Sequence, residues 1–119
     1  MEIYNLVTGE QERVVARFSD VDNNARKLEN VGVSSDDEAV STASIVEVRE
    51  WTSADGSVGT EVEVLAPYVG PGEATITIFG DPLPGEPSGM LSLSFGIHNM
   101  TAAAAGSIVS AVTEIIPVV

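Results

Sequence analysis

Short extended segments separated by turn-forming residues run through most of this 119-residue chain, and they constrain its fold more than any other feature. Apolar and polar residues alternate at positions 45–51, 60–65, 74–79 and 90–97, while Asp, Asn, Ser and Gly cluster between these segments. An alternation with a period of two places one set of side chains on a buried face and the other set in solvent. We therefore predict an all-β fold in which seven to nine antiparallel strands form a two-sheet sandwich.

The length predicts a single domain that covers residues 1–119, because a chain of this size can bury a core without disulfides. Residues 1–12 are expected to form an N-terminal arm or an edge strand. Pro82, Pro84, Gly85 and Pro87 lie close together, which predicts a rigid exposed loop at 80–88. Residues 102–119 are expected to form a C-terminal strand and an apolar tail, since β-branched residues follow Gly106.

The individual segments differ in how clearly they predict strands. Residues 74–79 are the clearest strand, and residues 26–33 are expected to be irregular with a short strand. Asp55-Gly56 favours a tight hairpin turn. In the strand predicted before it, Val46 and Val48 share one face, and the other face carries Ile45, Glu47, Arg49 and Trp51. In the strand predicted after it, Glu61 and Glu63 point outward and Val62 and Val64 point inward.

The charge balance excludes two classes of partner. Eighteen acidic residues stand against five basic ones, so the formal net charge is −13. Binding to nucleic acid needs clustered Lys and Arg, and Arg26-Lys27 is the single adjacent pair. An anionic membrane surface is disfavoured for the same reason. We expect no nucleic acid and no membrane among the partners.

An acidic chain with one lysine also fits a halophilic or marine source. Salt near 1 M shortens the range of charge repulsion to about 3 Å, and so removes a force that would loosen a compact acidic fold. An ordinary acidic bacterial protein is the alternative. Residues 1–10 lack the basic and apolar regions of a secretion signal, and no window is apolar for the roughly 18 residues that a membrane span needs. The product is therefore expected to be made in the host cytoplasm without being secreted.

The order of the turns and strands resembles the bacterial immunoglobulin-like domains of the group 2 type. The resemblance rests on an Asp/Asn turn at 18–24, a Ser-Ser-Asp turn at 33–40, the Asp55-Gly56 hairpin and a Gly-x-Ala-Thr-Ile-Thr strand at 72–81. It spans about residues 13–97. Two departures are the missing aromatic before the Ser-Ser-Asp turn and a longer Pro-rich insert. The resemblance implies an immunoglobulin-like β-sandwich used as a spacer, adhesive or assembly module, as in small structural proteins of tailed bacteriophages and archaeal viruses.

The residue types needed for catalysis are scarce, so no enzyme and no cofactor are expected. The chain has no Cys, which excludes disulfides, thiolate metal sites and cysteine nucleophiles. Its one His, His98, has no Asp or Glu beside it in the sequence and is expected to be structural or superficial. The carboxylates at 36–38 lie in a turn without apolar shielding, so a solvated turn is expected.

A calcium site is a weaker hypothesis. Asp20 and Asp22 have the spacing of the start of an EF-hand loop, but the later positions lack the required Gly and Glu. A loop site would use Asp20, Asp22 or Asp81. Asn99-Met100-Thr101 also matches the glycosylation pattern, which a chain of this length can contain by chance.

The sequence therefore predicts a non-enzymatic virion structural protein, specifically a capsid decoration (cement) protein that forms a homo-oligomer on the major capsid protein of a tailed-virus head. Its expected location is the virion. Attachment is expected through the apolar C-terminal residues and the Pro-rich loop, and Tyr68 is a further expected contact. Each contact buries a small area, but the repeated lattice multiplies the affinity. Core packing is the expected role of Trp51. The predicted contact residues are Leu83, Pro84, Tyr68, Ile115, Ile116, Val118 and Val119. A tail or turret component is the nearest alternative, and a cellular immunoglobulin-like adhesion or carbohydrate-binding module is another.

Overall fold

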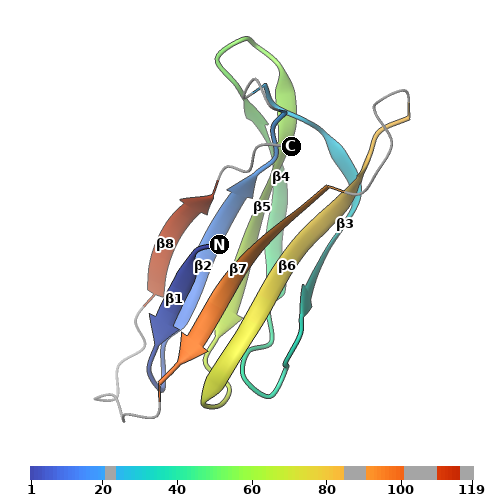
Figure 1. Ribbon diagram of the computed structural model, residues 1–119. Coiled ribbons are helices and arrows are strands. Elements are labelled where there is room, and N and C mark those ends of the chain that lie inside the picture. Colours follow the sequence, from blue (N-terminus) through green and yellow to red (C-terminus); the bar gives the residue numbers. More distant parts are fainter. Residues whose placement is uncertain (21–23, 85–90, 101–109, 116–119) are drawn as a thin grey trace.

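The computed structural model describes residues 1–20, 24–84, 91–100 and the backbone of the strand at 110–115 (Figure 1). It contains eight strands: β1 (Ile3–Leu6), β2 (Gln11–Arg17), β3 (Leu28–Ser35), β4 (Ser44–Thr52), β5 (Val58–Pro67), β6 (Gly72–Pro82), β7 (Leu91–Asn99) and β8 (Ser110–Ile115). The molecule is elongated, with extents of 49 × 25 × 21 Å.

The strands form two four-stranded sheets, with the orders β1-β7-β6-β3 and β4-β5-β2-β8. In Figure 1 the sheet that contains β6 and β7 lies in front of the sheet that contains β2 and β5. Hairpins join β4 to β5 and β6 to β7, whereas each other connection carries the chain from one sheet to the other. This arrangement confirms the predicted fold class, an immunoglobulin-like β-sandwich with a strand number in the expected range.

The core lies between the sheets and consists of the inward-facing alternate residues of the central strands. Tyr4 of β1 packs its ring edge-to-face against Phe95, with centroids 5.8 Å apart. The largest fully buried apolar side chains of β2, β5, β6 and β7 are Val14, Val62, Val64, Ile76, Ile78, Phe95 and Ile97. The alternation at 60–65, 74–79 and 90–97 is therefore confirmed, because these segments supply most of the core.

The terminal strands differ from the antiparallel pattern. β1 pairs parallel to β7 and β8 pairs parallel to β2, while the other pairings are antiparallel. Parallel neighbours need a long crossover connection, and most of the chain lies between the members of each of these two pairs. Each terminal strand lies at an edge of its sheet.

Two segments differ from their expected structure. Residues 28–35 form a full strand where an irregular segment was expected, and its irregularity is a bulge between Glu29 and Gly32. Asn30 adopts a left-handed φ of 54° there, which Asn tolerates better than most residues. Residues 80–82, expected to belong to the exposed loop, continue β6. Pro82 is tolerated because it is the last residue of the strand.

The hairpin between β4 and β5 forms where Asp55-Gly56 predicted it, but it is wider than a two-residue turn. Ser53 N donates to Ser57 O at 2.9 Å, so three residues make the reversal. Gly56 has a φ of 88°, which suits glycine. The Asp55 carboxylate accepts from the hydroxyls of Ser53 and Ser57, and these hydrogen bonds lower its pKa.

Candidate interaction surfaces

Three arginines and three glutamates form a continuous ion-pair network on the outer face of the sheet β4-β5-β2. In β2 and β5 alternation places them there, because the intervening Ala16 and Val62 are buried in the core. The register of β4 sets Glu47 opposite Glu63 and Arg49 opposite Glu61. We call this network the Arg–Glu ladder. Its members are Arg13 and Arg17 of β2, Glu61 and Glu63 of β5, and Glu47 and Arg49 of β4.

Glu61 and Glu63 are the centre of the ladder, and each carboxylate is held by two arginines. Arg17 Nε donates to Glu61 Oε1 at 2.7 Å, and Arg49 Nε donates to Glu61 Oε2. Arg13 Nη2 and Arg49 Nη1 both donate to Glu63 Oε1, at 3.0 and 3.1 Å. Arg49 Nη1 also reaches Glu47 Oε2 at 3.1 Å. The ladder therefore ties the edge strand β4 to β5 and β2 through side chains as well as backbone.

The environment keeps both central carboxylates ionised although each residue is 6% exposed. Burial acts to raise the pKa of Glu61, but hydrogen bonds from Arg17 and Arg49 outweigh it and lower the pKa. The hydrogen bond from Arg13 lowers the pKa of Glu63 against the effect of burial. The hydrogen bond to Glu61 raises the pKa of Arg49. Because each central carboxylate accepts hydrogen bonds from two arginines, the ladder is suited to stabilising the sheet.

Trp51 completes this face and corrects an expectation. Core packing was the predicted role of Trp51, but its side chain is half-buried on the outer face. The Arg17 guanidinium carbon lies 5.3 Å from the centroid of the Trp51 ring, in cation–π geometry. The alternation placed Val46 and Val48 together on the other face of β4. They are 50% and 49% exposed, because β4 is an edge strand and a bulge shifts its register at Ile45.

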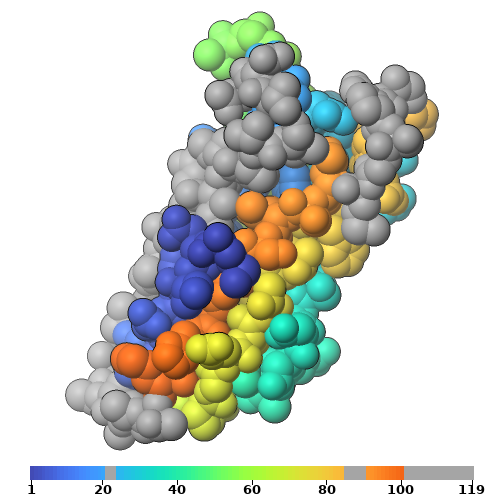
Figure 2. All heavy atoms as spheres, in the orientation of Figure 1, coloured from blue at the N-terminus to red at the C-terminus, as the bar shows by residue number. Residues whose placement is uncertain are grey.

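The outer face of the other sheet is uncharged across its middle. Register with the buried residues of β6 and β7 places hydroxyl, glycine and apolar side chains there, and Figure 2 shows this part of the molecule at the surface. Glu73 and Asp81 lie at the two ends of β6. We call the uncharged part the hydroxyl face. Its residues are Ile3, Gly32, Ser34, Thr75, Thr77, Phe79, Ser92, Ser94 and Gly96.

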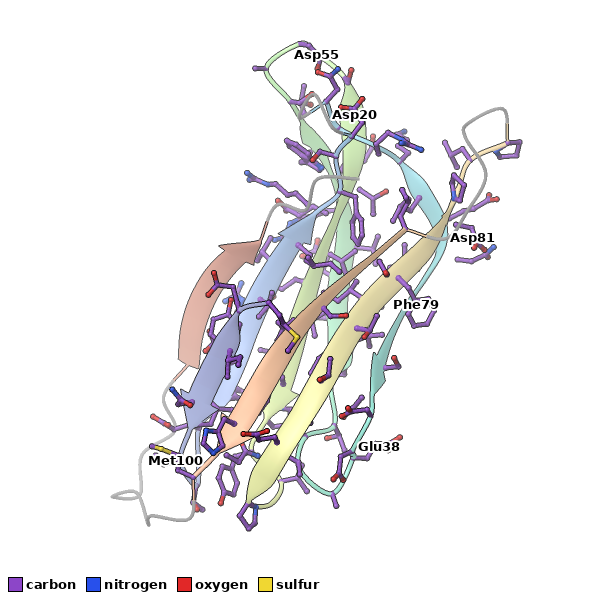
Figure 3. The ribbon with its side chains drawn as sticks, in the orientation of Figure 1. Asp20, Glu38, Asp55, Phe79, Asp81 and Met100 are labelled. Atoms are coloured by element: carbon purple, nitrogen blue, oxygen red, sulfur yellow. The ribbon has the colours of Figure 1, made fainter. Side chains whose placement is uncertain are left out.

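Several contacts link neighbouring strands across the hydroxyl face. Thr77 Oγ1 and Ser94 Oγ are 3.0 Å apart and share a hydrogen bond. The Phe79 ring lies over Gly32, where a Cβ atom would come within 2.6 Å of the ring (Figure 3). Ile3 lies over Gly96 in the same way, at 3.1 Å from an added Cβ. Both glycines therefore make room for a neighbouring apolar side chain on an otherwise hydroxyl-rich surface.

The residues expected to make interfaces lie at both ends of the sandwich. Leu83 and Pro84 directly follow β6, and Ile115 ends β8 opposite Ala16. In Figure 1 these two strand ends lie toward the same end of the molecule. Tyr68 lies at the opposite end, where it is half-buried against the core and its hydroxyl donates to Met100 O at 2.9 Å. The other expected interface residues, Ile116, Val118 and Val119, lie outside the described residues.

The candidate calcium ligands are not assembled by the described residues. The Asp20 carboxylate accepts a hydrogen bond from Asn24 N at 3.0 Å, which caps its own turn. Asp81 Oδ2 accepts from Asn30 Nδ2 at 3.2 Å, and Figure 3 shows Asp20 and Asp81 well apart. Asp22 lies outside the described residues. Within the described ranges, no group of three or more His, Asp or Glu side chains could hold a metal ion.

The remaining polar candidates have structural partners. Asp36 Oδ1 accepts from Thr75 N at 2.8 Å and so joins the end of β3 to β6. Asp37 Oδ1 accepts from Ala39 N at 3.1 Å and so caps its own turn. His98 is half-buried on β7 and pairs in register with Glu73. A hollow of about 220 Å³ opens between the end of β3 and the segment before β4, and Glu38 is the one ionisable side chain that lines it.

Sequence reasoning recognised the parts of the ladder but did not connect them. It placed Glu61 and Glu63 outward, and it placed Glu47 and Arg49 on one face. The missing information was the register between the strands. It sets Glu61 of β5 opposite Arg17 of β2 on one side and opposite Arg49 of β4 on the other side. The available signal was a set of opposite charges at two- and four-residue spacing on neighbouring predicted strands.

Comparison with known proteins adds little to the geometry. No protein-family model matches the chain, and no curated protein matches it. Among solved structures, the solution structure of Amebosin is similar at a TM-score of 0.41 and 13% identity, over 82% of this chain and 88% of that one. No helix in the described part of the chain is long and apolar enough to cross a membrane. Fold and surfaces together define a small two-sheet β-sandwich protein.

Proposed function

We propose that this chain is a non-enzymatic virion structural protein, a cement protein that decorates the outside of a tailed-virus head on a scaffold of the bacterial immunoglobulin-like group 2 type. Its partner is the major capsid protein, and its location is the virion. The proposal draws support from an elongated sandwich whose charged face is occupied by internal ion pairs. Such a face is suited to stability more than to chemistry.

The observation that carries the proposal is the common position of two predicted contact segments. Leu83 and Pro84 after β6 and the end of β8 lie toward the same end of the sandwich (Figure 1). An elongated module can contact the capsid lattice through one end and leave its sides exposed. Each contact is small, but several copies of the module in one oligomer would multiply the affinity.

Co-expression with the cognate shell protein, followed by gradient sedimentation, tests the attachment. We expect the chain to sediment with assembled shells, and Leu83→Asp to release it, because a charge would be buried at the contact. Val69→Asp is the matched control, since Val69 is exposed and lies next to Tyr68 at the other end. A chain that stays at the top of the gradient would refute the cement role.

Particles purified from the source culture distinguish the alternatives. Fixed stoichiometry with the shell protein at on the order of hundreds of copies supports decoration of the lattice, where avidity operates. A few copies per particle would indicate a tail or turret component. Absence from the particles would favour a cellular adhesion or carbohydrate-binding module.

A further inference from the structure

We propose that the hydroxyl face is a self-association surface, on which a second copy of this chain packs face to face. The inference names the surface through which copies would contact each other in the homo-oligomer of the proposed function. It does not depend on the chain being part of a virion, and its test uses the purified chain alone.

The distribution of charge selects this face. Two copies that each carry −13 repel one another over about 10 Å at 0.1 M salt, so they can approach closely through a surface without acids. The acids in excess lie in turns and at strand ends, among them Glu29, Asp36, Asp55, Glu73 and Asp81. The middle of the hydroxyl face carries no ionisable group. A second copy therefore fits this face better than a strongly charged partner does.

The Arg–Glu ladder is a poorer surface for the same partner. The side chains of Arg13, Arg17 and Arg49 are 42, 34 and 32% exposed and keep contact with water. Covering them would remove that hydration without supplying new partners, because the glutamates already hold them. Covering the Arg–Glu ladder therefore costs more free energy than covering the hydroxyl face.

The hydroxyl face has features that favour contact with a second sheet. The Thr77 and Ser94 hydroxyls at its centre share a hydrogen bond, which is kept when water leaves. Ile3 is 58% exposed on it and would be covered by the second copy. Gly32 and Gly96 carry no side chain, so no further atoms project from the surface beside Phe79 and Ile3. Faces of this kind pack about 10 Å apart, with strands crossing at about 30°.

The size of the face predicts a weak and reversible dimer. Four strands about 4.8 Å apart and about seven residues long, at about 3.3 Å per residue, present on the order of 450 Å² per copy. A dimer would bury roughly 900 Å², which is below the range of about 1,200–2,000 Å² for stable complexes. We expect a dissociation constant in the micromolar range, on the order of 10–100 μM.

Sedimentation equilibrium of the full chain tests the dimer, from about 5 to 500 μM protein, a range that brackets the expected constant. We expect a reversible dimer that tightens between 0.1 M and 1 M KCl, because salt screens the acidic rims. Ser94→Asp puts a charge in the centre of the face and should weaken the dimer at least about tenfold. Ser92→Asp, at an exposed position of the same strand, is the second variant.

Ser44→Asp on β4 is the control, because it makes the same chemical change at an exposed position away from the hydroxyl face. It should leave the dissociation constant unchanged. A chain that is monomeric throughout in 1 M KCl would overturn the inference. Equal weakening by Ser92→Asp, Ser94→Asp and Ser44→Asp would also overturn it, and so would an unaffected dimer in both β7 variants. A dimer that fails to bind shells would refute the cement role alone.

Discussion

Asn99 holds together three connections that are far apart in the sequence. Its Nδ2 atom donates to Val40 O at 2.7 Å and to Gly70 O at 2.8 Å, while Val40 O also accepts from Val69 N. The residue is 2% exposed. Although Asn99 begins a glycosylation motif, its amide is committed to these contacts, so the folded chain is a poor acceptor.

We expect Asn99→Ala to lower the free energy of unfolding by about 1–3 kcal/mol, since the Gly70 carbonyl loses its side-chain donor inside the fold. Urea unfolding followed by circular dichroism measures the change. Asn5→Ala is the matched control, because Asn5 is exposed on β1 and should change stability by less than about 0.5 kcal/mol. Equal effects of the two variants would contradict the assigned role.

Gly59 permits a close approach between β5 and the turn after β2. An added Cβ would lie 2.6 Å from Arg26 N and 2.9 Å from Arg26 O, and Thr60 N donates to that same carbonyl at 2.9 Å. Gly59→Ala should therefore cost about 1–3 kcal/mol, because backbone atoms must move. Gly96→Ala meets the flexible Ile3 side chain at 3.1 Å and should cost less, as parallel urea titrations would show.

The Arg–Glu ladder predicts how stability depends on pH at the level of the sheet. The ordinary pKa of both central carboxyls is 4.5, and the folded state lowers the pKa of each. The unfolded state therefore takes up protons first as the pH falls. The free energy of unfolding should be highest above about pH 4.5 and should fall progressively below it. Urea midpoints measured from neutral pH downward give this profile.

Arg49→Gln tests whether the ladder causes this pH dependence. The variant removes the donor shared by Glu61 and Glu63, so it should lower stability at neutral pH and flatten the acid slope. Lys27→Gln is the matched control, since Lys27 pairs at 3.2 Å with Glu50 and both side chains are largely exposed. The control should keep the slope of the unsubstituted protein. An unchanged slope in Arg49→Gln would assign the acid sensitivity to other groups.

Alternation predicted most of the strands but not the use of every face. Val62, Val64, Ile76 and Ile78 are buried as expected, because their strands lie in the middle of a sheet. Val46 and Val48 follow the same pattern but are exposed, because β4 lies at an edge. Periodicity predicts the direction of a side chain, whereas the position of the strand in its sheet decides whether a second layer covers it.

At the scale of the whole molecule, the net charge of −13 predicts a dependence on salt. The melting temperature should rise between 0.1 M and 1 M KCl as the Debye length falls from about 10 Å to about 3 Å. The melts should use a chloride salt, because sulfate stabilises folded proteins in general and would hide the effect of charge screening. A melting temperature that does not rise between 0.1 M and 1 M KCl would count against a halophilic source. Melts at low protein concentration keep self-association from contributing.

The amino-acid sequence was sufficient for the all-β class, the approximate strand number and most of the core. These properties follow from local alternation and turn chemistry, which depend on neighbours in the chain. Four properties required the tertiary structure. They are the strand order, the parallel pairing of β1 with β7 and of β8 with β2, the Arg–Glu ladder, and the uncharged hydroxyl face. Each of these depends on register between segments that can be more than 40 residues apart, such as Arg17 and Glu61. No local pattern specifies such a register.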